Sequence, residues 1–334
     1  MTINPVEHPF AQYVRILGRG KNTARSLTRE EAFAAFTHIL KAEVEDIQLG
    51  AFLLLLRVKG ESVEEMAGFA EAAQQFINAP ALAVDIDWPS YAGKHKQQPW
   101  YLLAALLLAA NGHAVFMHAS RYTTSSRVYA AQIFREWGVP ACQDWREVEQ
   151  QLSRRHFAFA ELGAFCPALD RLFSWRSLLG VRSPVNSLIK LANPLRAPCS
   201  LQSVFHPAYL EIHQQAALLL NHQYSLVLKG EGGEIEFRPD AENRLFLLNH
   251  GACSVEKWHR TQAKRQPDLE LHQLSSDYLK AVWTGAAEDD YGLQAVLGTV
   301  AMVLFASRFV STEQEAWSTA RDYWNARDRK PGYT

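Results

Sequence analysis

The spacing of apolar residues changes at Pro80, and this change restricts the possible folds more than any other feature of the chain. Before Pro80, apolar side chains recur every three or four residues, as at Phe33, Phe36 and Leu40, which predicts helices. After it, short apolar runs alternate with helical patterns. This alternation predicts an α/β fold in which a small helical N-terminal domain precedes a larger domain with a mainly parallel sheet. Strands are expected at residues 84–88, 114–118, 157–162 and 224–229, and helices at residues 99–110, 128–137, 167–179, 184–191, 291–309 and 312–326.

Two capping boxes mark helix starts in the N-terminal part. The segments TREE at residues 28–31 and SVEE at residues 62–65 place a hydroxyl three residues before a glutamate, so that side chains and backbone can cap each other. A further helix is expected to be capped by Asp46 and to end at Gly60. Its run FLLLL at residues 52–56 is apolar on every side, which predicts burial all round.

Several features favour a cytoplasmic protein without a membrane span. The N-terminus lacks the basic-then-apolar pattern of a signal peptide. The longest apolar runs, residues 100–110 and 295–306, are shorter than the roughly 20 residues that cross a bilayer. The cysteines are scattered without paired spacing, which is typical of free thiols in a reducing compartment. They are Cys142, Cys166, Cys199 and Cys253.

Positive charge is segregated along the sequence, although the formal net charge is −1. Residues 8–29, 88–135 and 171–210 contain no aspartate or glutamate, yet they hold fifteen of the 34 lysines and arginines. A surface built from these segments would attract a polyanion. The alternative is that the charges interleave again in space. The fifteen cations are Arg15, Arg19, Lys21, Arg25, Arg29, Lys94, Lys96, Arg121, Arg127, Arg135, Arg171, Arg176, Arg182, Lys190 and Arg196.

The helical part carries a family resemblance. LLRVKGESVEEMAGF, residues 55–69, resembles the N-terminal domain of anthranilate phosphoribosyltransferases, and the likeness continues more weakly to about residue 236. The resemblance implies a fold of the nucleoside phosphorylase/phosphoribosyltransferase type. It also implies a helical dimerisation domain at residues 1–80, joined by helices from about residues 165–195, and hence a homodimer. The α/β domain would comprise residues 81–164 and 196–334.

The family's phosphate-binding turn is degenerate here. The family holds phosphoribosyl pyrophosphate with a turn of the form GTGGD, because backbone N–H groups approach pyrophosphate closely only where side chains are absent. The corresponding segment is PSYAGK, residues 89–94. It keeps only Gly93, adds Lys94, and puts the ring of Tyr91 where the ligand would lie. We expect no donor binding of the family's kind, and Gly93 and Lys94 are predicted to belong only to a residual phosphate or substrate pocket.

A second motif resembles the family's KHGNR followed by serines. This chain keeps His118, Arg121 and a hydroxyl run that includes Ser125 and ends at Arg127. Arginine forks and hydroxyls suit phosphate oxygens, so this segment is predicted to form an anion-binding turn. His118 is either a ligand-binding residue or a histidine satisfied at the end of a strand.

The family's magnesium pair, an aspartate next to a glutamate, is also incomplete. Glu234 matches the glutamate, but Gly233 stands in the place of the aspartate. Magnesium is usually held by one or two carboxylates plus phosphates, so no magnesium and no other cofactor are expected. The segment at residues 174–194 resembles the family's aromatic-amine site, with Arg176 at the position of the carboxylate-binding arginine. Arg182 also matches, either as part of a residual substrate pocket or as a residue that ends a helix.

The N-terminal loop RILGRGKNTARSL, residues 15–27, is basic and contains two glycines. It resembles the loop of a bacterial side branch of the family that has degenerate phosphoribosyl motifs and binds nucleic acid. This resemblance and the charge pattern predict a protein without catalytic residues that binds DNA or RNA by the phosphate backbone. The alternative is a phosphoribosyl- or glycosyl-transferase with an unusual acceptor. The residues predicted to bind nucleic acid on one continuous surface are Arg19, Lys21, Arg25, Arg176, Lys190 and Arg196.

Overall fold

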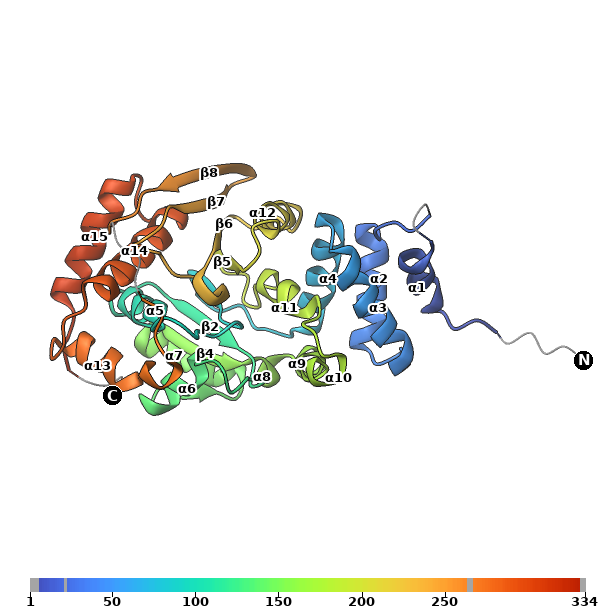
Figure 1. Ribbon diagram of the computed structural model, residues 1–334, viewed down its shortest axis with the longest axis horizontal. Helices are drawn as coiled ribbons and strands as arrows, with labels where there is room; N and C mark the ends of the chain where they lie inside the picture. The colour runs from blue at the N-terminus through green and yellow to red at the C-terminus, as the bar shows by residue number, and fades with distance from the viewer. Residues whose placement is uncertain (1–5, 21–22, 263–266, 331–334) are drawn as a thin grey trace, which may run out of the picture.

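The computed structural model describes residues 6–20, 23–262 and 267–330. Four helices lie at the N-terminal end of the molecule, and the sheet with its helices forms the rest (Figure 1). The four are α1 (Ala11–Gly18), α2 (Arg29–Leu40), α3 (Asp46–Lys59) and α4 (Val63–Phe76). Among the described residues, no helix is long and apolar enough to cross a membrane.

The predicted capping boxes are confirmed. The Thr28 hydroxyl accepts from the backbone N–H of Glu31, and the Ser62 hydroxyl accepts from that of Glu65. Glu65 also accepts from the N–H of Leu27 at 2.9 Å, so it ties the start of α4 to the segment before α2. The cap of α3 was predicted one residue late, because Glu45 occupies the N-cap position and Asp46 is the first helical residue.

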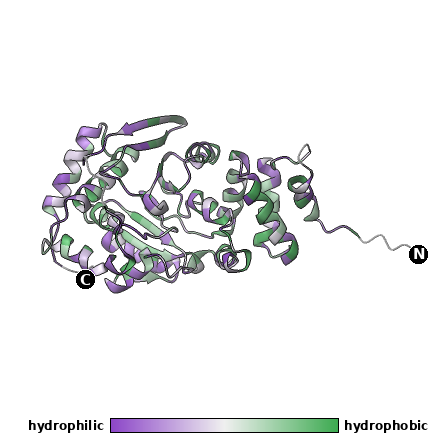
Figure 2. Ribbon diagram, viewed as in Figure 1, coloured by the Kyte–Doolittle hydropathy of each residue, from purple (hydrophilic) through white to green (hydrophobic). Residues whose placement is uncertain are grey.

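The prediction that α3 is buried all round is wrong. Phe52, Leu53 and Leu56 are buried, but Ile47, Leu54 and Val58 are 83%, 41% and 86% exposed. These three are spaced by seven and four residues, so they form one stripe along the helix. Figure 2 shows the hydrophobic residues along α3 at this end of the molecule. The helix therefore has a buried apolar face and an uncovered one.

The sheet of the α/β domain has eight strands in the order β3-β4-β2-β1-β5-β6-β7-β8. Pairing is parallel from β3 to β6 and antiparallel for β7 and β8. The mainly parallel sheet is confirmed, but the sequence prediction missed the β7–β8 hairpin and the short β3. The strands are β1 (Ile86–Pro89), β2 (Val115–Ala119), β3 (Ala141–Cys142), β4 (Phe157–Glu161), β5 (Cys199–Val204), β6 (Tyr224–Lys229), β7 (Asn243–Asn249) and β8 (Ala252–Trp258).

A separate apolar core covers each face of the sheet. On β2, Val115 and Met117 belong to one core and Phe116 to the other, as the two-residue period of a strand requires. The first core packs the sheet against α5 (Trp100–Ala110), α6 (Ala130–Glu136), α13 (Ser276–Thr284), α14 (Asp290–Ala306) and α15 (Glu313–Ala326).

The second core joins the sheet to the N-terminal helices. It contains side chains of α1 to α4 together with those of α7 (Trp145–Arg155), α8 (Leu162–Phe165), α9 (Pro167–Ser174), α11 (Val185–Leu188) and α12 (Tyr209–Leu219). The short α10 (Arg176–Leu179) and the 3-10 turn η1 (Ile189–Leu191) flank α11. The carboxyl ends of β1, β5 and β6 thus meet these connecting helices, which places a cleft at that edge of the sheet.

Candidate anion-binding cleft

The turn after β1 binds a carboxylate of the protein itself. The backbone N–H groups of Ala92 and Gly93 both donate to Oε1 of Glu234, at 2.7 Å each. Gly93 has a φ of +69°, and a Cβ there would lie 2.8 Å from the ring of Tyr129. The two amides that point to one acceptor form an anion site. An internal carboxylate, from a residue 142 positions away from Ala92, occupies that site.

Glu234 is fully buried, and this burial raises the pKa of its carboxyl although nearby Lys190 and the two amides act in the opposite direction. Its Oε1 atom is committed to the turn. Gly233, at the predicted position of the family's aspartate, adds no carboxylate. No cluster of three potential metal ligands occurs in the part of the chain that the structure describes. The residues present therefore do not fit the family's magnesium ion.

Lys94 does not belong to a ligand pocket, which corrects the sequence prediction. Its side chain is fully buried, and its Nζ lies 2.6 Å from Oε1 of Glu236. The other oxygen of Glu236 accepts from the backbone N–H of Tyr101 at 2.9 Å, at the start of α5. The lysine thus neutralises a buried acid that anchors a helix, and it is unavailable to a ligand.

His118 is a satisfied core histidine. Its ring is fully buried between the hydroxyl of Tyr91, 2.7 Å from Nδ1, and the carboxylate of Asp87, 3.1 Å from Nε2. Tyr91 is itself buried, and its ring stacks on that of Phe173 with the centroids 5.4 Å apart. Of the two interpretations of His118, the structural one is therefore correct.

Arg121, Ser125 and Arg127, which belong to the predicted anion-binding turn, line one pocket with a volume of about 660 Å³. Arg127 donates to the backbone carbonyls of Ala92, Gly93 and Gly232, so its guanidinium mainly holds two turns together. Arg121 lies 3.0 Å from the carboxylate of Asp170 while 59% of its side chain stays exposed. This pocket is lined by neither Gly93, Lys94, His118 nor Arg182.

The predicted surface of six cations does not form as one surface. Lys190 is buried, and its Nζ donates to the carbonyls of Ser203 and Gly233 at 2.6 and 3.3 Å. Arg196 precedes β5 and lies at the amino edge of the sheet, one strand length of roughly 20 Å from the cleft at the carboxyl edge.

The N-terminal members of the set lie elsewhere. Arg19 and Arg25 are exposed near α1, at the far end of the helical bundle from β1 (Figure 1). Arg25 forms an ion pair with Glu31 at 2.6 Å. Lys21 lies outside the described residues. Of the described members of the predicted surface, the exposed Arg176 and the buried Lys190 lie at the cleft.

Charges that are segregated in the sequence partly interleave in space. Among the described residues, six of the cations from the acid-free segments lie within ion-pair distance of a carboxylate from outside those segments. This reduces the positive potential that the sequence alone suggested. The pairs are Arg15–Glu7, Arg25–Glu31, Arg29–Glu71, Lys94–Glu236, Lys96–Asp268 and Arg121–Asp170.

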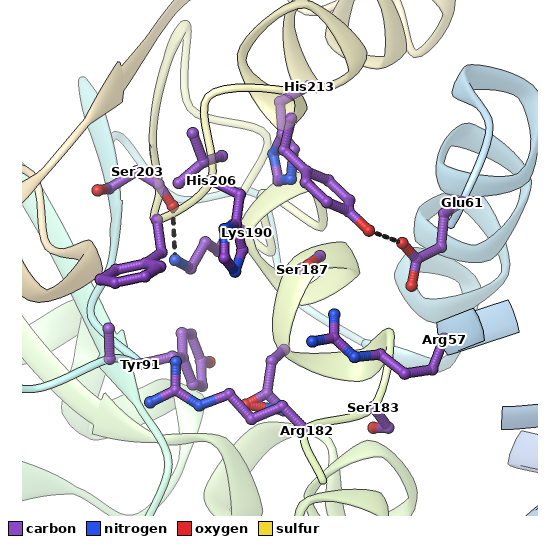
Figure 3. A pocket seen from close by; sticks show the side chains of 15 residues that line it. Arg57, Glu61, Tyr91, Arg182, Ser183, Ser187, Lys190, Ser203, His206 and His213 are labelled. Carbon is purple, nitrogen blue, oxygen red and sulfur yellow. Dashed lines mark hydrogen bonds between the residues drawn. The ribbon is translucent and has the colours of Figure 1, made fainter. Parts of the chain in front are cut away.

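A different set of basic side chains lines a cleft at the carboxyl edge of the sheet. A cavity of about 120 Å³ is lined by Arg57, Arg182, Lys190 and His206 (Figure 3). A second pocket of about 300 Å³ is also lined by Arg182 and adds Arg176 and aromatic rings. Burial lowers the pKa of Arg182, and the nearby charges of Arg127 and Arg176 lower it further. The fold therefore holds these positively charged side chains close together although they repel one another.

Sequence reasoning missed Arg57 and His206. Arg57 lies near the C-terminal end of α3 and His206 follows β5, so 149 residues separate them and only the fold brings them to one cavity. Arg57 does stand inside the segment LLRVKGES that carries the family resemblance. That signal is weak, because a lone arginine near a helix C-terminus is also explained by the helix dipole.

The fold and the degenerate site define a class of protein. The family profile for the helical bundle domain of the glycosyl transferase family matches residues 11–77, and that for its a/b domain matches residues 101–326. The chain belongs to this family. Over 95% of this chain and 94% of the other, the fold matches the anthranilate phosphoribosyltransferase TrpD of Thermus thermophilus with a TM-score of 0.77 and 23% identity.

Two relatives share a larger part of their sequence with this chain. The chain is 36% identical to the uncharacterized protein YbiB of Escherichia coli strain K12. The 285 aligned residues cover 83% of this chain and 88% of YbiB. It is 34% identical to the anthranilate phosphoribosyltransferase of Methylocella silvestris. These 233 aligned residues cover 69% of this chain and 66% of that enzyme. The resemblance to this family that the sequence motifs indicated is thus confirmed.

Proposed function

We propose that the protein is a homodimer that binds DNA or RNA through the phosphate backbone, on a transferase fold whose donor site is closed. One observation carries the proposal: the anion site of the turn is filled by a carboxylate of the protein, whereas the arginines of the cleft are not. The amides of Ala92 and Gly93 are taken by Glu234, while the arginines of the cleft have no carboxylate partner among the described residues. A protein with this arrangement binds phosphates with exposed side chains and not with the turn.

The cleft offers a track for a phosphate backbone. Arg57 and Arg176 are exposed, and Arg182 lies between them as a lining residue of both pockets. Aromatic rings of Tyr91, Tyr122 and Phe173 line the second pocket beside these cations. Arginine next to aromatic rings suits a strand whose phosphates pair with the cations while its bases stack on the rings.

The homodimer is supported by the uncovered stripe on α3. Ile47, Leu54 and Val58 form an exposed apolar row on the helical domain. Exposed apolar patches of this kind mark contact surfaces, and a symmetric dimer would cover the same stripe on both copies. The dimer would also bring two clefts into one particle, which increases the avidity for a long strand.

A fluorescence titration against random-sequence oligonucleotides across a salt series tests the proposal. Each phosphate contact releases a counterion, so the log of the affinity should fall with the log of salt by roughly 0.9 per contact for duplex or 0.7 for single strands. Weak sequence preference and a steep salt response are expected. A flat salt response would contradict phosphate-backbone binding.

The second candidate is a transferase with an unusual acceptor. It is favoured by the similarity to the anthranilate phosphoribosyltransferase of Methylocella silvestris and by the pocket that contains Arg121, Ser125 and Arg127. Calorimetry with phosphoribosyl pyrophosphate and magnesium decides between the two. Magnesium-dependent binding at micromolar concentration, abolished in Glu234→Ala, would restore the enzyme and refute the closed donor site.

A further inference from the structure

The 120 Å³ cavity of the cleft collects cations from separate parts of the fold. Arg57 comes from α3, Arg182 and Lys190 flank α11, and His206 follows β5. Figure 3 shows Arg57 and Arg182 extending along the cavity, with Lys190 and His206 on one side of it. Side chains from these elements meet only because the helical domain packs on the carboxyl edge of the sheet, so the cavity is a product of the whole fold.

Little negative charge faces these cations. Among the described residues that line the cavity, Glu61 is the only acid, and its carboxylate accepts a hydrogen bond from the hydroxyl of Tyr209. Glu234 acts on Lys190 from behind the cavity wall, but its Oε1 is bound to the amides of the turn. Arg57, Arg182 and, below its pKa, Lys190 therefore outnumber the one lining acid, and an anion would relieve their repulsion.

The cavity has room for a small anion. Its volume of about 120 Å³ is enough for one tetrahedral oxyanion. The hydroxyls of Ser183 and Ser187 and the amide of Asn186 also line it. Arginine forks and hydroxyls are the groups that suit phosphate oxygens.

The adjoining pocket provides room for what the phosphate is attached to. It shares Tyr91, Arg182 and Asn186 with the cavity and has a volume of about 300 Å³. The stacked rings of Tyr91 and Phe173 form part of its wall, at 24° to each other. An aromatic wall next to a phosphate-sized cavity matches a nucleotide, whose base can stack while its phosphate is bound by charge.

We propose that the cavity binds a terminal phosphomonoester of a nucleotide, with the attached sugar and base in the adjoining pocket. A terminal phosphomonoester carries nearly two negative charges and an internal phosphodiester carries one, so the terminal group matches the cluster of cations better. The end of a strand and a free nucleoside monophosphate present this same chemistry. The inference refines the nucleic-acid function proposed above and rests on it.

The test compares matched oligonucleotides that differ only in a terminal phosphate. One single strand of about ten nucleotides is prepared with a 5′-phosphate, with a 3′-phosphate and with hydroxyls at both ends, and each is titrated into the full-length protein. The wild type should bind a phosphorylated end roughly tenfold more tightly than the hydroxyl form, the value of one or two charge-assisted hydrogen bonds. A nucleoside monophosphate as competitor distinguishes the two sources, because it competes as well as the phosphorylated strand only if a free nucleotide is sufficient.

Variants assign the preference to the cavity. Arg57→Ala should abolish the preference for the phosphorylated end, and Arg57→Lys should restore part of it. Arg57 is exposed and forms no ion pair with the described residues, so the fold should tolerate both changes. Arg154→Ala, at an exposed arginine on α7, is the control and should keep the preference. A preference that survives in Arg57→Ala would place the terminal phosphate elsewhere and overturn the inference.

The pH dependence gives an independent readout. The pKa of Lys190 is lowered to about 8, mainly by burial and also by the charge of Arg182, although Glu234 acts in the opposite direction. His213 and the rim residues Arg57, Glu61 and His206 also face this group. A bound phosphate favours the charged lysine, so the terminal-phosphate preference should weaken as pH rises above about 8.

The outcomes separate the two proposals. Equal affinity for all three oligonucleotides, with a steep salt response, would overturn the terminal-phosphate site and leave backbone binding intact. No binding of any oligonucleotide would overturn both.

Discussion

The Lys94–Glu236 pair gives a quantitative test of the conclusion that Lys94 belongs to the core and not to a ligand pocket. Both side chains are at most 1% exposed, and their charged atoms lie 2.6 Å apart. Lys94→Met keeps the length of the side chain but removes its charge. Glu236 is then a buried carboxylate with only the N–H of Tyr101 as a partner. Removal of one partner of a buried pair costs about 3–5 kcal/mol of folding free energy.

The chain offers a matched control two residues away. Lys96 pairs with Asp268 at 2.7 Å, but both side chains are 43% exposed. An exposed pair contributes about 0–1 kcal/mol, so Lys96→Met should have little effect. In the double variant Lys94→Met/Glu236→Gln the isolated charge is gone, and much of the lost stability should return. Urea unfolding followed by circular dichroism measures all three variants.

The sign of the pH dependence follows from the buried acid. Burial raises the pKa of Glu236, and Lys94 lowers it. Without Lys94 the folded-state pKa rises further above that of the unfolded chain. The cost of Lys94→Met is then largest at high pH and shrinks as pH falls and Glu236 becomes protonated. Equal and small losses in Lys94→Met and Lys96→Met, or a cost that grows toward acid, would refute this reasoning.

Two further predictions follow from the fold. Leu54→Glu with Val58→Glu places charge on the exposed stripe of α3 and should convert a dimer to a monomer in analytical ultracentrifugation; a variant that stays dimeric would move the interface elsewhere. Gly93→Ala combines a φ of +69° with a Cβ 2.8 Å from the ring of Tyr129, so it should lower stability by about 1–3 kcal/mol in thermal unfolding. Gly112→Ala, with a φ of +88° but open space, should cost less, and the reverse order would contradict the packing argument.

Local sequence signals predicted the elements that depend on neighbouring residues. The hydroxyl and the glutamate three residues later act within one helical turn, which is why the starts of α2 and α4 were predicted correctly. The strand Tyr224–Lys229 was likewise predicted with its observed bounds. The all-round burial of α3 failed because an apolar run shows that a helix avoids water, but not which partner covers it.

The candidate site was less predictable because its contacts are distant in the sequence. Glu234 reaches Ala92 and Gly93, and Glu236 reaches Lys94, across more than 140 residues. A basic residue in an acid-free segment therefore says little about its charge environment in the fold. Lys190 illustrates the point, because it lies in such a segment and is buried against two carbonyls. The loss of the family's glycines is visible in the sequence of the turn itself. The carboxylate that fills the turn, from Glu234, could not be predicted from that segment.

The central claim is that this transferase fold binds nucleic acid with the cations of its cleft. A side-by-side titration of Arg176→Glu and Arg321→Glu with one labelled oligonucleotide across a salt series tests it most directly. Arg176 is an exposed residue of the cleft, and Arg321 is an exposed residue of α15 at the opposite end of the molecule (Figure 1). Arg176→Glu should weaken binding at least tenfold and reduce the salt slope by roughly 0.7–0.9, one lost phosphate contact, while Arg321→Glu leaves both unchanged. Equal losses in the two variants, or an unchanged affinity in Arg176→Glu, would contradict the claim.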